Sequence, residues 1–376
     1  MLFLALILLI PFHYLCEEDI RSTQQPNRIR QFKQCTSKFV NYHPSKYESD
    51  WVDNIVTRQE SVCYHLLKEI SQQNIWFTGS QGYHENHKIN LTDPSFREVF
   101  SCFEYIRKCK VGGGTGSSKS EPVYELIEPL AGHLRDHRTL CGMHKINIPN
   151  FPVSKTGSGI DKRHILLGGS KTLPTIFFNN EGGSGNGAAS SATTQLSKRM
   201  IRRQPTILIM DIGAGQSYLD SQKWFVDQYI NKGFKLGRIV MWEAGPHSPS
   251  SIFSDVPTDV ISNYQFFNMP VTSDFTSNMH PWKVLSELAP LYNYVALKLD
   301  IDYPSLENEL IKQLTDDPLL LSSIDEMFFE HHINNNETLK FWENSKNGVD
   351  GSKTLSDSFD LFTRLRKYGI RIHGWP

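Results

Sequence analysis

One apolar run that ends in an acidic residue and two glycines constrains the fold of this chain most. Residues 207–217 read Ile-Leu-Ile-Met-Asp-Ile-Gly-Ala-Gly-Gln-Ser, and a helical pattern follows. The apolar run predicts a buried strand and the glycines predict a sharp turn. Many α/β proteins hold a nucleotide-like cofactor with this order of strand, turn and helix. Two glycines alone also fit an ordinary turn between a strand and a helix.

The sequence after this run alternates between strand and helix patterns. Strands are expected at 207–212, 238–243, 264–268, 294–300, 324–330 and 370–372, and helices at 219–232, near 251, and at 282–288, 305–315 and 357–367. Such alternation predicts βαβ units and a parallel sheet. We therefore expect an α/β fold in residues 204–376: a Rossmann-like, mostly parallel sheet with helices on both faces. The carboxyl ends of its strands would share one ligand-binding edge.

The first half of the chain shows helical spacing and contains all six cysteines. Helices are expected at 45–72 and 94–110, and a helix or helix–turn at 124–140, so residues 35–165 would form a small, mainly helical region. Cys102 and Cys109 would lie two turns apart on the second helix, roughly 10 Å from each other, which is too far for a disulfide between them. Disulfides to other cysteines are favoured, and buried free thiols are the alternative.

Several segments are expected to lie outside the folded units. They are an apolar leader at 1–16, a polar stem at 17–34, a Gly/Ser loop at 111–120 and a low-complexity insertion or linker at 166–203. The leader is too short to span a bilayer as a helix and fits a signal peptide or a short signal-anchor. With the sequons at Asn90 and Asn336, it predicts the secretory pathway, either the Golgi lumen or secretion. Membrane association would come only through an uncleaved leader.

Charged residues stand at the ends of the predicted strands. Glu243 ends the second strand, about thirty residues after the glycine turn, where a carboxylate can accept hydrogen bonds from ribose hydroxyls. Lys298, Asp300 and Asp302 alternate at the end of the fourth strand and therefore share one face. A buried lysine needs a partner, so an ion pair with an aspartate is one interpretation. Placement of a substrate hydroxyl or a metal by the carboxylates is the other.

The fifth strand ends in Glu330-His331-His332. Paired histidines beside carboxylates can complete a divalent-metal set with Asp300 and Asp302, supply a general base, or be ordinary loop histidines. Neighbouring residues of a strand point in opposite directions, so one histidine at most faces a given site. We take Asp300 and His331 as the catalytic candidates and assign no metal ligand.

These strand-end motifs together resemble class I S-adenosylmethionine-dependent methyltransferases. The motifs are Asp211-Ile-Gly-Ala-Gly215, Trp242-Glu243, Leu297-Lys-Leu-Asp-Ile-Asp302 and Phe328-Phe-Glu-His331. The Lys-x-Asp-x-Asp run is similar to the FkbM-type branch, whose members often methylate sugar hydroxyls, and to an uncharacterised methyltransferase-like group of algae and related protists. The resemblance covers residues 204–376, and residues 126–135 are similar to the upstream region of that last group.

The resemblance implies a role for each matching residue. Asp211, Gly213 and Gly215 would line the methionine and ribose part of S-adenosylmethionine, and Glu243 would hold the ribose hydroxyls. Asn268 would lie near the adenine, and Asp300 would face the sulfonium and the acceptor. The chain departs from the family at Ser217, which replaces the third glycine, at Tyr303, which follows Asp302, and in a short C-terminus that leaves little room for a closing β-hairpin.

The predicted function is therefore an S-adenosylmethionine-dependent O-methyltransferase that acts on a hydroxyl of a small molecule or a glycan. The net charge of −1 gives no basic footprint, so nucleic acid is not an expected partner. A catalytically silent binding module on the same fold is one alternative. A nucleotide-sugar-dependent Golgi transferase, with Asp300-Ile-Asp302 as its metal-binding motif, is the other.

Overall fold

The computed structural model describes residues 33–84, 94–111, 118–135, 137–143, 162, 164–168, 204–215, 217–337 and 352–375. The predicted leader, nearly all of the predicted stem, and most of the Gly/Ser loop and of the linker lie outside these residues. Among the described residues, no helix combines the length and the apolar character needed to cross a membrane.

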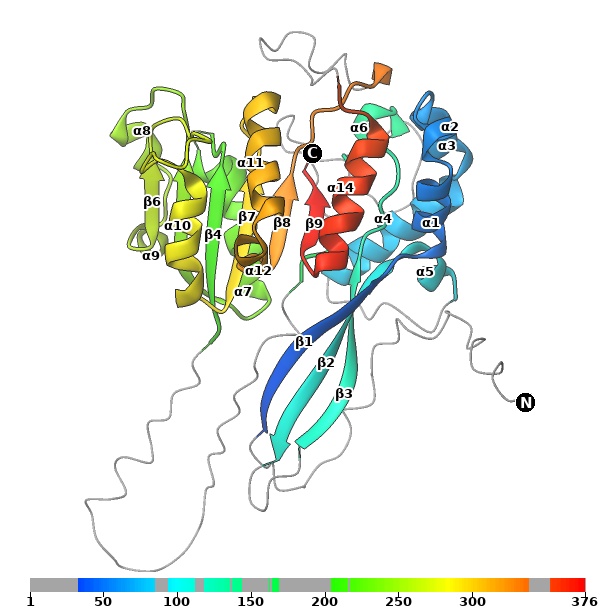
Figure 1. Cartoon of the computed structure of the whole chain (residues 1–376), viewed down its shortest axis with the longest axis horizontal. Coiled ribbons are helices and arrows are strands. Elements are labelled where there is room, and N and C mark those ends of the chain that lie inside the picture. Colours follow the sequence, from blue (N-terminus) through cyan, green and yellow to red (C-terminus); the bar gives the residue numbers. More distant parts are fainter. Residues whose placement is uncertain are drawn as a thin grey trace, which may run out of the picture.

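A six-stranded parallel sheet forms the centre of the second half of the chain (Figure 1). Its order is β6-β5-β4-β7-β8-β9, and every neighbouring pair is parallel. The strands are β4 (Thr206–Ile212), β5 (Lys235–Trp242), β6 (Tyr264–Phe267), β7 (Tyr294–Leu299), β8 (Glu326–Phe329) and β9 (Arg371–Gly374). The predicted Rossmann-like sheet is confirmed. The chain runs outward from β4 to β6 and then returns to β7, so the strand order reverses between β4 and β7.

Helices cover both faces of this sheet because successive strand residues point to opposite sides. Leu208 and Met210 of β4 belong to a core with the helices of one face, and Ile207 and Ile209 belong to a core with those of the other. The first face carries α10 (Pro281–Leu288), η5 (Ala289–Leu291), α11 (Pro304–Asp316), α12 (Pro318–Ser322) and α14 (Leu355–Tyr368), and the second carries η4 (Tyr218–Gln222), α7 (Lys223–Asn231) and α9 (Thr258–Ile261). A further short helix, α8 (Pro249–Phe253), follows β5.

The first half of the chain combines helices with an antiparallel sheet that extends away from the rest of the molecule (Figure 1). Its helices are α1 (Lys46–Asp53), α2 (Ile55–Arg58), α3 (Val62–Lys68), α4 (Ile70–His84), α5 (Pro94–Val99) and α6 (His137–Leu140). The strands are β1 (Lys33–His43), β2 (Ser101–Val111) and β3 (Ser118–Ile127), in the order β1-β2-β3.

Two of the predicted N-terminal helices are wrong over much of their length. The helix expected at 94–110 ends at Val99, and β2 follows it. The helix expected at 124–140 begins as β3, and only its last four residues form α6. Apolar positions in 96–106 fit a helical period, but Phe103, Tyr105 and Ile106 also favour strands, and pairing with β1 and β3 decides in favour of the sheet.

The described cysteines form disulfides, as the sequence predicts. Cys63 and Cys141 form a disulfide that ties α3 to the end of α6, with a Cα–Cα distance of 5.2 Å. Cys102 and Cys109 of β2 are also disulfide-bonded, and none of the described cysteines is free. The free-thiol alternative is therefore wrong for these residues. Cys102 and Cys109 are seven positions apart along the strand, a distance of about 23 Å, so they cannot bridge each other in this conformation either.

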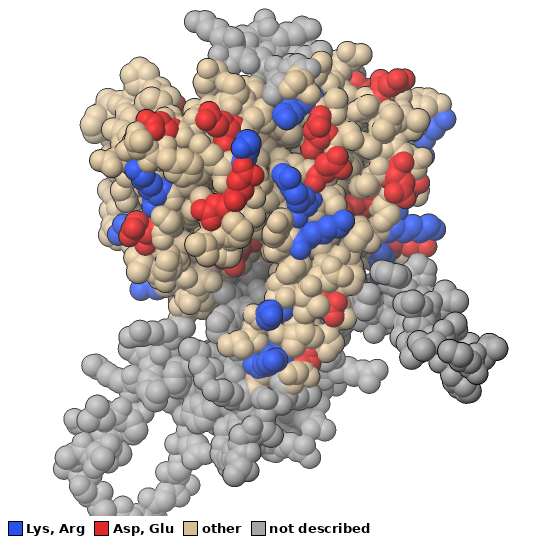
Figure 2. All heavy atoms as spheres, viewed as in Figure 1, with Lys and Arg blue, Asp and Glu red and all other residues tan. Residues whose placement is uncertain are grey.

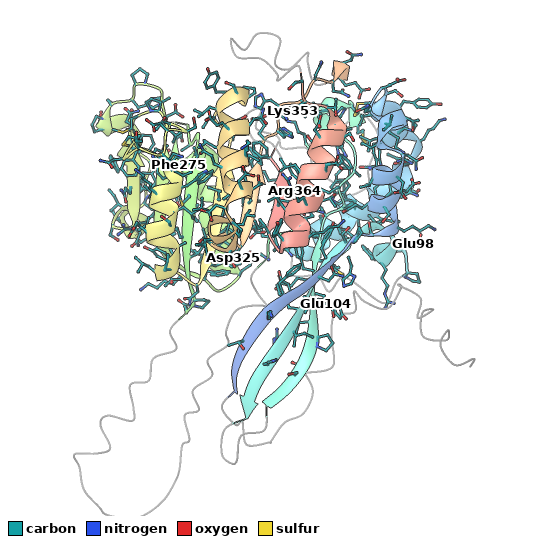
Figure 3. The ribbon with its side chains drawn as sticks, viewed as in Figure 1. Glu98, Glu104, Phe275, Asp325, Lys353 and Arg364 are labelled. Atoms are coloured by element: carbon teal, nitrogen blue, oxygen red, sulfur yellow. A yellow bond between two sulfur atoms is a disulfide. The ribbon has the colours of Figure 1, made fainter. Side chains whose placement is uncertain are left out.

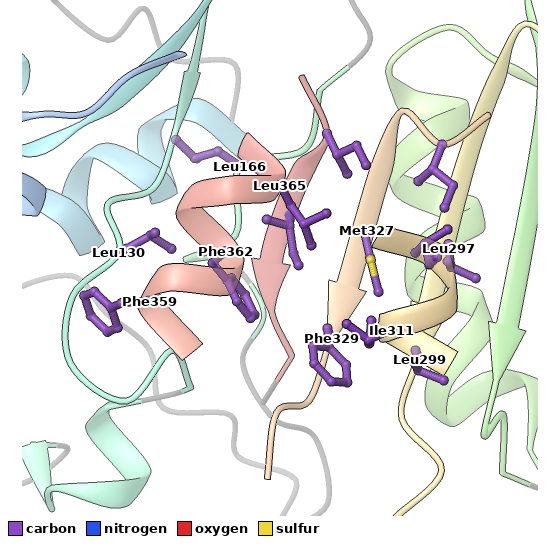
Figure 4. Close-up of a cluster of buried hydrophobic side chains, with 14 of the residues drawn as sticks. Leu130, Leu166, Leu297, Leu299, Ile311, Met327, Phe329, Phe359, Phe362 and Leu365 are labelled. Carbon is purple, nitrogen blue, oxygen red and sulfur yellow. The ribbon is translucent and has the colours of Figure 1, made fainter. Parts of the chain in front are cut away.

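The hydrophobic core crosses the expected domain boundary at residue 204. Trp51 of α1 and Leu66 of α3 belong to the same cluster as strand β4 and the helices on its face. Helix α14 lies between the two halves, and its Phe359 and Phe362 point into this cluster (Figure 4). The two halves therefore share one apolar core on this side of the parallel sheet.

Candidate functional site

The glycine turn after β4 is shaped by the neighbouring strand β7. Gly213 has a φ of +86°, and a Cβ placed there would lie 1.6 Å from the carbonyl oxygen of Asp300. The amides of Gly213 and Ala214 both donate to the carbonyl of Trp242, at 3.0 Å each. Only glycine combines this left-handed conformation with this close approach, which explains the residue that the sequence places here.

A cleft opens at the carboxyl edge of the sheet, where the strand order reverses between β4 and β7. Figure 3 shows Asp325, which precedes β8, at the lower edge of the sheet, and Phe275, which follows β6, near the upper edge. The cleft has a volume of about 290 Å³, near the lower end of the range for small-molecule sites. Its lining consists of Gly213, Gly215, Trp242, Glu243, Ala244, Met269, Pro270, Val271, Asp300, Ile301, Asp302, Tyr303 and Leu306.

Glu243 lines this cleft, at the position where the sequence predicts a ribose-binding carboxylate. Its Oε2 accepts a hydrogen bond from the amide of Gly215 at 3.0 Å, and its Oε1 accepts one from the amide of Gly245 at 2.7 Å. These two bonds fix the orientation of the carboxylate. Each carboxylate oxygen has a second lone pair, so Glu243 can still accept bonds from two hydroxyls of a ligand.

Asn268 does not line the cleft but braces the loop beside it. Its side-chain amide donates to the carbonyls of Glu243 and Gly245, and its Oδ1 accepts from the amide of His247 at 3.1 Å. The adjacent Met269 lines the cleft instead. A flat apolar part of a ligand would therefore contact Met269, and not Asn268, which the sequence analysis placed there.

Asp211 is buried below the glycine turn and is not part of the cleft lining. Its Oδ2 accepts a hydrogen bond from Gln222 at 3.0 Å, and its Oδ1 lies 3.2 Å from Lys298 Nζ. Burial raises the pKa of Asp211, and the Lys298 charge opposes this effect. Asp211 therefore contacts Gln222 and Lys298 under the turn, and it does not lie at the cleft wall where the resemblance implies contact with a cofactor.

Lys298 contacts the glycine turn after β4, the buried Asp211 and the carboxylate of Asp300 after β7. Its ammonium donates to the carbonyl of Gly213 at 2.7 Å and pairs with Asp211 and, at 2.9 Å, with Asp300. Burial alone would lower the pKa of Lys298, but the two carboxylates hold it above its ordinary value. Lys298 is therefore charged at neutral pH, and the predicted ion pair between Lys298 and an aspartate is confirmed.

Asp300 lines the cleft, and its carboxylate lies within 4.8 Å of that of Glu330, which follows β8. Burial opposes ionisation of Asp300, but the Lys298 ammonium holds the pKa of Asp300 well below its usual range. Burial and the nearby charge of Asp300 raise the pKa of Glu330. Arg135 Nη1 lies 2.5 Å from Glu330 Oε1. The pair therefore joins an ionised carboxylate at the cleft to a buried carboxyl that binds protons more readily.

The structure does not bring His331 to the cleft. Its Nδ1 lies 2.6 Å from the hydroxyl of Ser358 on α14, and its ring stacks on Phe329. His332, on the opposite side of the chain, is the histidine that faces Asp302 and Glu330. The expectation that one histidine at most faces the site is met, but the histidine is His332.

The sequence did not reveal the part that three residues play in this site. Met269 and Tyr303 directly follow predicted strand ends, so their positions in the chain could have indicated that they lie near the site. Arg135 comes from the loop between β3 and α6, far from Glu330 in sequence, and no local pattern links the two.

Comparison with known proteins adds nothing to this description, since no protein-family model, no curated protein and no solved structure matches the chain.

Proposed function

We propose that this protein binds S-adenosylmethionine in the cleft between β4 and β7 and transfers its methyl group to a hydroxyl. The observation that carries the proposal is the hydrogen bond from the amide of Gly215 to Glu243, which follows β5 and lines the cleft beside the point where the strand order reverses. Ligands of open α/β sheets bind at such points, and an acidic residue at the end of the second strand suits a ribose.

The chemistry around the glycine turn favours a ligand without phosphates. A dinucleotide needs the amides at the start of the helix that follows the glycines for its pyrophosphate. Here the amides of Tyr218 and Leu219 donate to the carboxylate of Asp255, and the hydroxyl of Ser217 donates to it at 2.7 Å. A carboxylate at this position repels a phosphate. The acidic lining of Glu243, Asp300 and Asp302 instead suits a cationic sulfonium ligand.

The transfer needs alignment more than chemical activation. The acceptor oxygen attacks the methyl carbon in line with the breaking carbon–sulfur bond, and S-adenosylhomocysteine leaves with the bonding electrons. Asp300, ionised next to Lys298, accepts the hydrogen bond of the acceptor hydroxyl. The proton released from the hydroxyl passes to the Asp300–Glu330 pair, in which Glu330 has the raised pKa. Glu330 thus takes the role that we expected of His331.

Binding of labelled S-adenosylmethionine by equilibrium dialysis tests this proposal. We expect Glu243→Ala to weaken binding by tenfold or more, because each lost hydrogen bond to a charged group is worth about 1.5–3 kcal/mol. Glu287→Ala, which removes an exposed carboxylate of α10, is the matched control and should bind as the wild type does. Absence of binding to the folded wild type, or equal affinity in Glu243→Ala, would contradict the proposal.

The nucleotide-sugar transferase stays a second candidate because both Asp300 and Asp302 line the cleft, as a metal-binding pair would. It predicts that a nucleotide sugar binds only when Mn²⁺ is present.

For both candidate functions, three expectations stay predictions: the acceptor class, the secretory location and the absence of a nucleic-acid partner. On the face that Figure 2 shows, acidic and basic side chains are interspersed, and no continuous basic stripe stands out.

A further inference from the structure

Four side chains form a compact donor set, two from the segment after β7 and two from the segment after β8. Asp300, Asp302, Glu330 and His332 each offer one ligand atom, and these atoms all lie within 4.8 Å of one another. We propose that this four-residue set binds a divalent cation of the Mn²⁺ class beside the cleft. The proposal does not depend on the methyl donor. It concerns the metal-bound protein, in which Glu330 is an ionised ligand, whereas the transfer step described above concerns the metal-free protein, in which Glu330 takes the proton. It replaces our expectation that the protein has no metal ligand.

The position of His332 is the first support for a bound cation. This side chain is 1% exposed, and its Nε2 points at two carboxylates, 3.5 Å from Glu330 Oε2 and 3.7 Å from Asp302 Oδ1. Both separations are longer than an ordinary hydrogen bond. Two ligands that bind the same ion at about 2.1 Å are separated by about 3 Å at a right angle and about 4 Å when opposite. The observed spacing therefore fits atoms that share an ion.

The charges around the set are the second support. The ion pairs here join two cations, Lys298 and Arg135, to a group with four carboxylates, namely Asp211, Asp300, Asp302 and Glu330. A divalent cation would supply the two positive charges that this group lacks, and carboxylates bind such an ion in their ionised form. Arg135 binds Oε1 of Glu330, whereas Oε2 faces His332, so one oxygen of Glu330 is directed at the set.

The donor types indicate which cation the set would take. Three carboxylates suit Mg²⁺, Ca²⁺ and Mn²⁺, and an imidazole favours a transition metal among these. Mn²⁺ meets both preferences. Because Asp300 and Asp302 also line the cleft, an ion held by this set would lie at the wall of the cleft.

Titration of the metal-stripped full chain with Mn²⁺, followed by electron paramagnetic resonance, tests this inference without any methyl donor. We expect one tightly bound equivalent of Mn²⁺ per chain, seen as loss of the signal of the hydrated ion. Asp302→Asn should weaken binding about tenfold or more. The side chain of Asp302 is 73% exposed, so this variant should fold normally, and circular dichroism checks this. Asp360→Asn, an exposed position of α14 outside the set, is the matched control.

His332→Gln supplies a second variant, since it removes the nitrogen ligand and keeps a polar side chain. Folded protein that binds no Mn²⁺, or equal affinities in wild type and Asp302→Asn, overturns the proposal. These results are independent of the S-adenosylmethionine measurement, so failure of one proposal can be told from failure of the other.

Discussion

At Gly213 the backbone of the glycine turn comes so close to β7 that no side chain fits. Its positive φ alone would disfavour other residues, but Gly215 and Gly233 share that property, and a Cβ added at either would have nothing within 4 Å. Gly213 differs from these two glycines because the carbonyl of Asp300 lies against it. Asp300 also pairs with Lys298 and lines the cleft. A change at Gly213 therefore acts on the site and on stability together.

Replacement of Gly213 by alanine should cost clearly more stability than Gly233→Ala. At Gly233 we expect a loss of about 1–2 kcal/mol from the left-handed conformation alone. At Gly213 the same strain is added to a displacement of the end of β7, so the free energy of unfolding should fall by about 3 kcal/mol or more. Urea unfolding of both variants measures this difference. Equal losses would show that the close approach to Asp300 is not limiting.

At the scale of elements, the alternation of strands and helices after residue 206 was predictable because each element is long enough to bury a regular face. Strands β4 to β9 and helices α7, α10, α11 and α14 all fall where the sequence places them, within a few residues. The strand β2 was not predictable, because its aromatic residues fit both periods and its partners β1 and β3 decide the outcome. Glu243 and Asp300 could be predicted as site residues because they follow predicted strands. The directions in which the side chains after β8 point could not be predicted from the sequence.

A substitution of His331, which follows β8, tests whether its side chain points away from the cleft. His331→Gln should lower the free energy of unfolding by about 1 kcal/mol, since it disturbs the hydrogen bond to Ser358 and the stacking on Phe329. It should leave binding of S-adenosylmethionine and Mn²⁺ unchanged, because His331 faces α14. Thermal unfolding and dialysis on the same preparation measure both effects. A large loss of ligand binding with normal stability would return His331 to the site.

At the scale of the whole molecule, buried ion pairs join the two halves of the chain. His373 of β9 lies 2.5 Å from Glu128 and 2.8 Å from Glu326, and Arg366 of α14 lies 3.2 Å from Glu48 of α1. The partners in the two halves are separated by more than two hundred residues, so no local pattern could predict them. These pairs add buried polar contacts between the two halves to the apolar core that the halves share.

This network predicts a stability that depends on pH. Burial alone would raise the pKa values of Glu128 and Glu326, but His373 lowers both to about 2. Their contribution is full above their ordinary pKa of 4.5 and is lost as the pH falls from about 4.5 towards 2. Burial disfavours the charged form of His373, yet Glu128 raises its pKa, so its contribution is full below pH 6.5 and is lost as the pH rises through the raised value.

We therefore expect the free energy of unfolding to be highest between about pH 4.5 and 6.5, and to fall by a few kcal/mol on acidification to pH 3. His373→Gln should flatten the acidic limb, because the two carboxylates lose the charge that lowers their pKa values. Urea unfolding between pH 3 and 8 measures both profiles. The same acidic slope in wild type and variant would contradict this assignment.

We propose above that the cleft after β4 binds S-adenosylmethionine and not a phosphorylated nucleotide. Isothermal titration of the full chain with S-adenosylmethionine, NAD⁺ and a nucleotide sugar, each with and without Mn²⁺, tests it most directly. We predict binding of S-adenosylmethionine in the micromolar range and no measurable binding of NAD⁺, since Asp255 occupies the amides that a pyrophosphate needs. Binding of NAD⁺ or of a nucleotide sugar in preference to S-adenosylmethionine would contradict the account.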